Sequence, residues 1–323
     1  MKISRFTVAV LIGAILIEVT VLIASAVASR ASSMSTERDG VVSASSDLSA
    51  LMPYEPLTTN DPYLEKQWAL TQLEPNRLWQ VTEGKPGVIV AVLDTGIDNY
   101  HEDLTGKVIA ELSFADSPTP GDVHGHGTHI AGIIAASTNN DVGITGLAPA
   151  AKLINVKVAD DGGHCRASSL ARGIYWAVYN GCHIINISIE LREPSIELER
   201  AVNYAWSRGV LVVGAAGNDG GQCVAYPAFY QNCVAVAALK QDQTLAPLSN
   251  YGDWVDVFAP GYDIYSTLPG DRYGYKTGTS FAAAQGSGLA ALLFNVVADT
   301  DGDAKLNDEV RAAIEARLPH AWK

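Results

Sequence analysis

Apolar and polar positions alternate between two patterns along most of the chain after about residue 60. Four short, nearly continuous apolar runs predict buried strands at 88–93, 152–158, 183–189 and 210–215. Segments with apolar or small residues at helical spacing predict helices at 127–137, 167–180, 196–207 and 280–295. Such apolar strands between helices are typical of a parallel sheet that is covered on both faces, so the sequence predicts an α/β fold.

Polar residues of special interest fall where two of these strands end. Asp94 follows the first strand, and Asn218 follows the strand at 210–215. In open α/β sheets, reactive groups gather at the carboxyl ends of the strands. We therefore expect a functional site at this edge of the sheet.

The composition is that of an acidic globular protein. The chain has 323 residues, of which 48% are hydrophobic and 18% charged, and its net charge is −13. This length fits one large domain with extensions, or two smaller domains. The negative charge argues against nucleic acid as a partner and is compatible with cation binding.

The first 55 residues read as an export and processing segment. Lys2 and Arg5 precede a long apolar run over 6–28, which predicts a signal peptide at 1–28. The run approaches the length of a membrane span, so an uncleaved anchor stays open, although Glu18 within it disfavours a permanent span. Residues 29–55 are rich in Ser and Ala, show no sustained period and predict a flexible leader. The folded domain is expected at 56–323, outside the cytoplasm.

Three glycine-containing motifs carry the candidate chemistry. They are Val-Leu-Asp94-Thr-Gly, His126-Gly-Thr-His and Gly-Thr-Ser280. A serine hydroxyl needs an imidazole to take its proton, and the imidazole needs a buried carboxylate to hold its tautomer. Each motif alone is typical of a strand end or a turn, but all three together predict Ser280 as nucleophile, His126 as general base and Asp94 as orienting acid.

A fourth motif, Ala-Ala-Gly-Asn218, predicts an oxyanion hole. A fixed side-chain amide and a backbone N–H can stabilise the oxyanion of acyl transfer, and Asn218 and the Ser280 N–H are the candidates. Gly-Asn-Asp-Gly is also an ordinary turn sequence, which is compatible with that role.

The order Asp, His, Ser and the sequences around these residues resemble the subtilases, the subtilisin-like serine proteases, and most closely their thermitase branch. The resemblance runs from about residue 60 to about 317 and includes Gly-His126-Gly-Thr-His-Ile-Ala-Gly and Gly-Thr-Ser280-Phe-Ala. It implies a three-layer α/β/α fold with a mainly parallel central sheet. It also implies hydrolysis of peptide bonds in extended polypeptides, by a protein expected to be a monomer.

The same resemblance implies a structural calcium site. It assigns side-chain oxygens of Asp61, Asp103 and Asn140 and backbone carbonyls of Ser137, Val142 and Ile144. Such a mixture of six oxygens suits Ca²⁺, and the site would fasten the N-terminal arm to the domain.

A second acidic loop, at 299–308, begins like an EF-hand. Its glycine comes too early and its twelfth position is Val310, so we favour a surface loop that caps the next helix with Asn307 as N-cap.

Substrate is expected to lie as an extended strand between the segments 161–165 and 187–191. The first segment contributes Gly163 and the second contributes Glu190 to substrate binding. Ser188, Ile189, Ala215, Gly217 and Ala225 are expected to line the pocket for the substrate side chain at the cleavage site, with an apolar preference. The chain departs from the family with Glu190 and Leu191 where glycines are usual, and with Cys165 in the first segment. It also has Ala284 in place of the usual proline after Ser280, and it ends at Lys323, earlier than usual for the family.

Four cysteines in an exported chain suggest disulfides. A bridge between Cys223 and Cys233 would close a short loop. Cys165 and Cys182 flank the predicted helix at 167–180, which is too long for a bridge between its ends.

The resulting hypothesis is a secreted, calcium-stabilised serine endopeptidase. Two alternatives stay open: a catalytically impaired subtilase that binds extended peptides, because its cleft edges are altered, and a serine esterase with the same triad. The absence of a Gly-x-Ser-x-Gly elbow disfavours the esterase.

Overall fold

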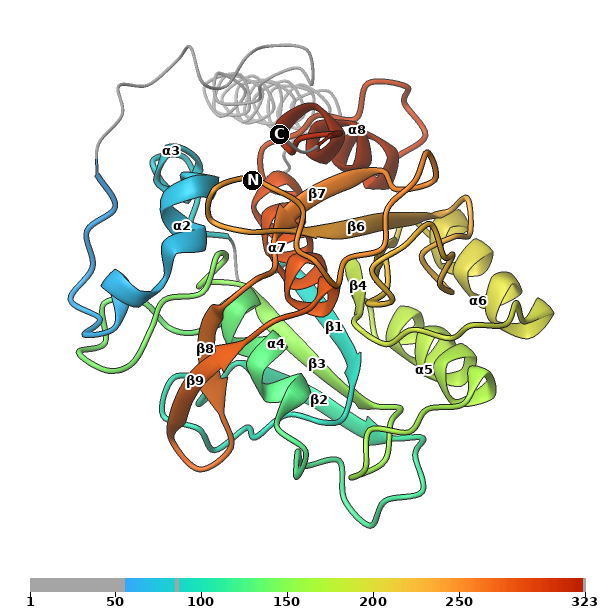
Figure 1. Ribbon diagram of the computed structural model, residues 1–323, viewed down its shortest axis with the longest axis horizontal. Coiled ribbons are helices and arrows are strands. Elements are labelled where there is room, and N and C mark those ends of the chain that lie inside the picture. Colours follow the sequence, from blue (N-terminus) through green and yellow to red (C-terminus); the bar gives the residue numbers. More distant parts are fainter. Residues whose placement is uncertain (1–55, 85–86, 322–323) are drawn as a thin grey trace, which may run out of the picture. The chain divides into compact units, whose positions relative to one another are not determined.

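The computed structural model describes residues 56–84 and 87–321 (Figure 1). The predicted signal segment at 1–28 and leader at 29–55 lie outside the described residues. Within the described part, no helix combines the length and apolar composition needed to cross a membrane.

A seven-stranded sheet forms the centre of the domain, and all of its strand pairs are parallel. The order across the sheet is β2-β3-β1-β4-β5-β6-β7. The strands are β1 Ile89–Asp94, β2 Val108–Ser113, β3 Lys152–Lys157, β4 Ile184–Ile187, β5 Leu211–Ala215, β6 Cys233–Leu239 and β7 Val257–Pro260. A separate antiparallel hairpin consists of β8 Ile264–Leu268 and β9 Arg272–Lys276.

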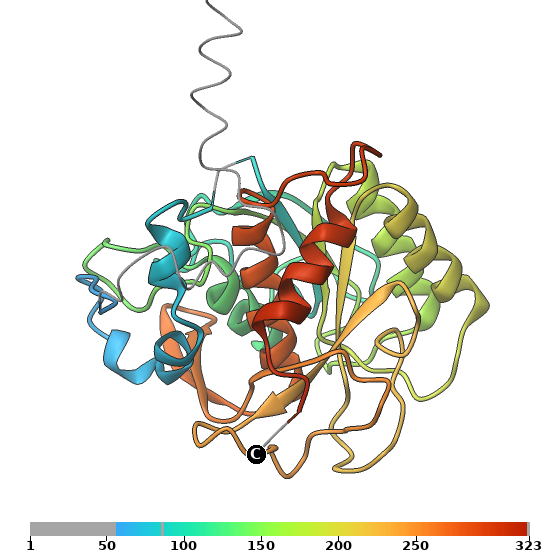
Figure 2. The same cartoon turned by 90° about the horizontal axis from the view of Figure 1, so that it is seen from above.

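Helices cover both faces of this sheet (Figures 1 and 2). One face carries α4 His126–Ala135, α7 Thr279–Leu293 and α8 Asn307–Arg317, and the other carries α5 Ala167–Tyr179 and α6 Ile196–Ser207. Short helices follow one another in the N-terminal arm: a 3-10 turn at Leu64–Lys66, α2 Trp68–Leu73 and α3 Pro75–Trp79. The predicted three-layer α/β/α architecture is confirmed.

The strands read as continuous apolar runs because their side chains enter two different cores. In β1, Val90 and Val92 join the core beneath α4 and α7, whereas Ala91 and Leu93 join the core beneath α5 and α6. Successive strand side chains point to opposite faces, and here neither face meets water.

Helix α7 is buried along its whole length. It packs against strands of the central sheet and against α4 and α8, so it has no polar face. Small residues permit this close packing; a Cβ added at Gly288, for example, would lie 2.8 Å from the Cβ of Leu147. The first turn of this rigid helix carries Ser280.

One detail of the predicted acidic loop is wrong. Asn307 is the first residue of α8, its N-cap is Leu306, and no side chain caps this helix end. The buried Asn307 amide instead donates to the backbone carbonyl of Trp206, 3.3 Å away, and so ties α8 to α6.

The four cysteines are free thiols, so the predicted bridge between Cys223 and Cys233 is not present. Cys233 is buried at the start of β6, with its sulfur against Gly214, whereas Cys223 is exposed. Cys165 and Cys182 are also unbridged, as expected from the length of α5. Burial raises the pKa of the Cys165 thiol to about 12, so this thiol stays protonated at neutral pH.

Candidate active site

The structure brings Asp94 and His126 together at the edge where β1 ends. Asp94 is the last residue of β1 and fully buried, and His126 is the first residue of α4. His126 Nδ1 lies 2.7 Å from Asp94 Oδ1, so the ring donates this N–H to the carboxylate. Burial lowers the pKa of His126, but the charge of Asp94 and this hydrogen bond outweigh it and leave the pKa above its ordinary value.

Asp122 organises the approach of α4 to β1, a role that the sequence reasoning missed. Its Oδ1 accepts from Thr95 Oγ1 at 2.9 Å, and its Oδ2 accepts from the Thr128 backbone N–H at 2.9 Å, in the first turn of α4. Thr95 in turn accepts the Gly127 N–H at 3.0 Å. An acidic residue just before a predicted helix is a start signal, and it could have drawn attention to Asp122.

Ser280 lies in the first turn of α7 and is 7% exposed. Its hydroxyl donates to the backbone carbonyl of Ser188 at 3.0 Å, and Ser188 Oγ donates to the Ser280 carbonyl at 2.9 Å. The hydroxyl is therefore turned toward Ser188, and none of the hydrogen bonds between described residues joins it to His126. The two segments meet through Phe281, whose ring centroid lies 5.5 Å from that of His126.

Asn218 is fixed by the start of α7. Its Oδ1 accepts from the Thr279 backbone N–H at 2.9 Å and from Thr279 Oγ1 at 3.2 Å. Because the oxygen is held in this way, the side-chain N–H₂ group points to the other side, where its nitrogen lies 3.5 Å from Glu190 Oε2. Thr279 also accepts the Gly217 N–H at 3.0 Å. This threonine therefore fixes both the backbone turn at 217–218 and the side-chain amide of Asn218.

Three of the predicted substrate-contact residues lie close together. A Cβ built on Gly217 would lie 3.0 Å from Glu190 Oε2 and 3.2 Å from the Cβ of Ala225. Gly217 has φ of +103°, a conformation that favours glycine. Antiparallel hydrogen bonds of 2.9 Å between Leu191 and Tyr226 hold the two segments at this spacing.

The remaining predicted contact residues are more dispersed. Gly163 lies in a closed loop beside His124, which a Cβ at this glycine would approach to 3.3 Å. Ile189 packs partly against the core beneath α5 and α6. Ala215, at the end of β5, is 3% exposed and belongs to the core beneath α7.

The residues assigned to calcium converge between the N-terminal arm and the loop after α4. Asp61 accepts the Asn139 and Asn140 backbone N–H groups, each at 3.2 Å. Asp103 accepts the Asn140 side-chain N–H at 2.9 Å and the Ile144 backbone N–H at 2.9 Å. Both carboxylates are buried, and none of the ion pairs between described residues involves either of them.

This donor set fits a hard cation. No hydrogen bond described within 56–84 and 87–321 ends on the three assigned carbonyls, those of Ser137, Val142 and Ile144. Gly143, between the last two, lets Asp103 approach the loop closely, because a Cβ here would lie only 2.0 Å from Asp103 Oδ2. Burial raises the pKa of Asp103, because the buried carboxylate has lost the water that would stabilise its charge. A bound cation would stabilise that charge.

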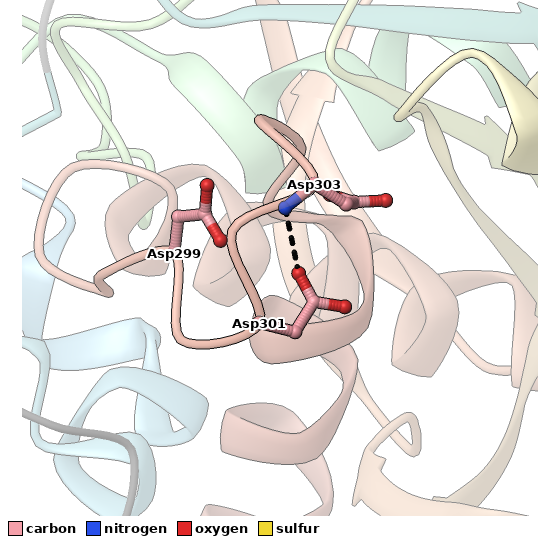
Figure 3. Close-up of side chains that lie close together, drawn as sticks. All are labelled: Asp299, Asp301 and Asp303. Carbon is pink, nitrogen blue, oxygen red and sulfur yellow. Dashed lines mark hydrogen bonds between the residues drawn. The ribbon is translucent and has the colours of Figure 1, made fainter.

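A second acidic group consists of Asp299, Asp301 and Asp303, whose carboxylates lie close together on an exposed loop (Figure 3). Their oxygens are used within the loop itself. Asp299 accepts the Gly302 and Ala304 N–H groups at 2.6 and 3.0 Å, and Asp301 accepts the Asp303 N–H at 3.0 Å. This pattern accounts for the sequence as a surface loop before α8.

Comparison with known proteins decides the family. A model of the subtilase family matches residues 85–317. The chain is 45% identical to a thermophilic serine proteinase of Bacillus sp. (strain AK1) and 41% identical to thermitase of Thermoactinomyces vulgaris, each over 260 residues. Both alignments cover 80% of this chain; they cover 63% of the first relative and 90% of the second. The chain also shares 48% identity with Subtilisin Savinase of Lederbergia lenta over 208 residues, which is 64% of the chain and 76% of the relative.

The chain belongs to the subtilase family. Its similarity to thermitase places it in the thermitase-like branch, as the motifs predicted. The protein is thus a subtilisin-like serine endopeptidase by class, a hydrolase, and its parallel sheet with flanking helices is the subtilisin-like fold. The chain spans less than two thirds of the length of the first relative.

Proposed function

We propose that this subtilase cleaves extended polypeptides through Asp94, His126 and Ser280, with Asn218 stabilising the oxyanion. The observation that carries the proposal is the 2.7 Å contact between a fully buried carboxylate and His126 Nδ1. This contact leaves Nε2 of the neutral ring as the acceptor, which is the tautomer that a general base requires.

The chemistry follows from this arrangement. His126 Nε2 takes the proton of Ser280 Oγ as the oxygen attacks the peptide carbonyl, and a tetrahedral oxyanion forms. The Asn218 side-chain N–H and the Ser280 backbone N–H at the start of α7 donate to this oxygen. His126 then gives its proton to the leaving amine, and water hydrolyses the acyl-enzyme by the same steps in reverse order.

The direction of the Ser280 hydroxyl bears on this mechanism. It points to the Ser188 carbonyl in the described structure, so attack requires the hydroxyl to turn toward His126. Catalytic hydrogen bonds are often absent in resting enzymes and form with substrate bound. The alternative of an impaired, peptide-binding subtilase draws its support from the same hydrogen bond.

Active-site labelling distinguishes these two functions. A protein comprising residues 55–323 is incubated with a fluorophosphonate in the presence of calcium. The adduct is then located by peptide mass mapping. We expect an adduct on Ser280 that is lost in His126→Ala. A folded protein without an adduct would refute the enzyme and favour the peptide-binding alternative, whereas cleavage of esters but not of casein would indicate an esterase.

We further propose that calcium is held by Asp61, Asp103 and Asn140 together with the three free carbonyls, and that it is structural. The ion would neutralise two buried carboxylates and join the arm to the loop after α4. It takes no part in bond cleavage, because its ligands are distinct from the catalytic residues.

Removal of calcium is expected to lower the melting temperature. An ion present at a thousandfold excess over its Kd stabilises the fold by about 4 kcal/mol, which for a domain of this size is about 10 °C. Differential scanning calorimetry of the Ser280→Ala protein, which cannot digest itself, in calcium and in EDTA would measure the difference.

Asp61→Asn should remove most of this calcium response, and Asp299→Asn on the exposed loop should leave it intact. If instead Asp299→Asn abolished the response and Asp61→Asn did not, the stabilising site would be the loop of Figure 3.

Export is the third part of the proposal. The basic start and the apolar run at 6–28 support passage across a membrane, and the polypeptide substrates of the family are compatible with an extracellular site of action. Sequencing the N-terminus of the protein recovered from culture medium would separate a cleaved signal from a retained anchor.

A further inference from the structure

The Glu190 carboxylate lies directly at the proposed oxyanion amide. Its Oε2 accepts the Asn218 backbone N–H at 3.0 Å and lies 3.5 Å from the Asn218 side-chain nitrogen. The same oxygen packs against Gly217, 3.0 Å from where a Cβ would stand, and the Asn250 side-chain nitrogen lies on that position at 2.4 Å. Glu190 therefore lies beside the turn at 217–218 and close to Ala225.

A substrate would place one particular side chain beside this carboxylate. If its reacting carbonyl oxygen binds the Asn218 amide, the Cα of the same residue is two bonds from that oxygen. The side chain on this Cα then starts beside Gly217 and Asn218, where the Glu190 carboxylate lies. Glu190 thus faces the side chain on the acyl side of the scissile bond.

Glu190 forms no ion pair with a cationic side chain among the described residues. The charged groups that act on Glu190 are Asp219, which raises its pKa, and Arg192, which lowers it, and these two pair with each other at 2.5 Å. None of the ion pairs between described residues includes Glu190. Burial raises the pKa of Glu190 above its ordinary value, and neither the Asn218 N–H nor Arg192 offsets this effect.

An uncharged substrate side chain would bury this carboxylate further and keep its negative charge beside the developing oxyanion. Both effects raise the activation free energy of the attack on the carbonyl, because the Glu190 carboxylate and the oxyanion repel each other strongly in a partly desolvated site. A cationic side chain would do the opposite by pairing with Glu190 and drawing the carboxylate away from Asn218. Uncharged and cationic substrates therefore differ in the free energy of the transition state, in which the oxyanion develops.

We propose that Glu190 makes this subtilase selective for substrates with Lys or Arg as the residue whose carbonyl is attacked. The inference rests on the proposed function and specifies its substrate class. This selectivity replaces the apolar preference expected from the sequence. That expectation did not take the Glu190 carboxylate into account.

Matched peptides test the selectivity. Fluorogenic peptides that differ only at the acyl residue, with Arg, Gln or Leu, are compared by kcat/KM in the wild type and in Glu190→Gln. We expect the wild type to prefer Arg over Gln by about tenfold, the preference to weaken with added salt, and Glu190→Gln to abolish it. Glu193→Gln removes the same charge from an exposed neighbouring position and should keep the preference.

A second readout does not require turnover. Benzamidine, a small amidinium, should protect Ser280 from the fluorophosphonate in the wild type, with at least about tenfold weaker protection in Glu190→Gln. An Arg-to-Gln ratio and a benzamidine protection that are equal in the wild type and Glu190→Gln would overturn the inference while leaving the protease intact. Failure of both labelling and cleavage in the folded wild type would overturn the proposed function itself.

Discussion

Asp94→Asn is expected to lower kcat/KM by about 10⁴-fold, the magnitude known for the equivalent change in other Ser-His-Asp hydrolases. The asparagine would keep the size of the side chain but could present its N–H₂ to His126 Nδ1. The ring would then hold its proton on Nε2 and could not accept one from Ser280. Peptide hydrolysis under pseudo-first-order conditions would measure the loss.

The pH profile separates this cause from a general loss of structure. In the wild type, kcat/KM should rise with pH through the pKa of His126, because only the neutral ring is a base. Asp94 holds this pKa above its ordinary value, so the rise of the residual activity in Asp94→Asn should move to lower pH. Asp116→Asn, at a side chain that is 82% exposed, should change neither rate nor profile. An unmoved profile in Asp94→Asn would contradict the electrostatic role of Asp94.

Asn218→Leu is expected to lower kcat by about 10²- to 10³-fold with KM nearly unchanged, because the lost hydrogen bond forms only in the transition state. Leucine has a similar size but no donor for the oxyanion. Steady-state kinetics on the best matched peptide would provide both constants.

Asn218→Asp is the matched variant for this prediction. It keeps the oxygen that accepts from the Thr279 N–H at 2.9 Å, but it lacks the amide donor. We expect it to be as slow as Asn218→Leu. Recovery of wild-type kcat in Asn218→Asp would show that Asn218 acts by holding α7 in place and does not bind the oxyanion.

Much of the fold that buries continuous apolar surface was predictable from the sequence, although the equally buried strands β6 and β7 were not predicted. β1, β3, β4 and β5 and the helices α4 to α7 lie within about two residues of the predicted ranges, since their periods report burial directly. β2 was not predicted, because it has no buried residue and alternates only between exposed and half-buried positions. The hairpin β8–β9 was not predicted either, because its strands mix polar and aromatic residues, and its position depends on packing against α4 and on stacked tyrosines such as Tyr265 and Tyr273.

In the candidate site, residues within short motifs were predicted from the sequence, whereas the roles of residues that depend on distant partners were not. Asp94, His126, Asn218 and Ser280 were predicted as site residues from short motifs, because residue type and glycine context indicate the chemistry. The role of Asp122 depends on Thr95, 27 residues away, and that of Glu190 depends on Asn218, 28 residues away. Side-chain partners of this kind are set by the folded arrangement and leave no periodic pattern in the sequence.

The complete burial of α7 has a consequence for when the protein can first act. This helix has no face that water would tolerate, so it can pack only after the strands β4 to β7 and the helix α4 are available to receive it. Such long-range assembly comes late in folding. Under the proposed mechanism, a growing chain that already contains Asp94 and His126 would carry no functional nucleophile, and proteolysis could begin only after synthesis has passed residue 293 and the core has closed.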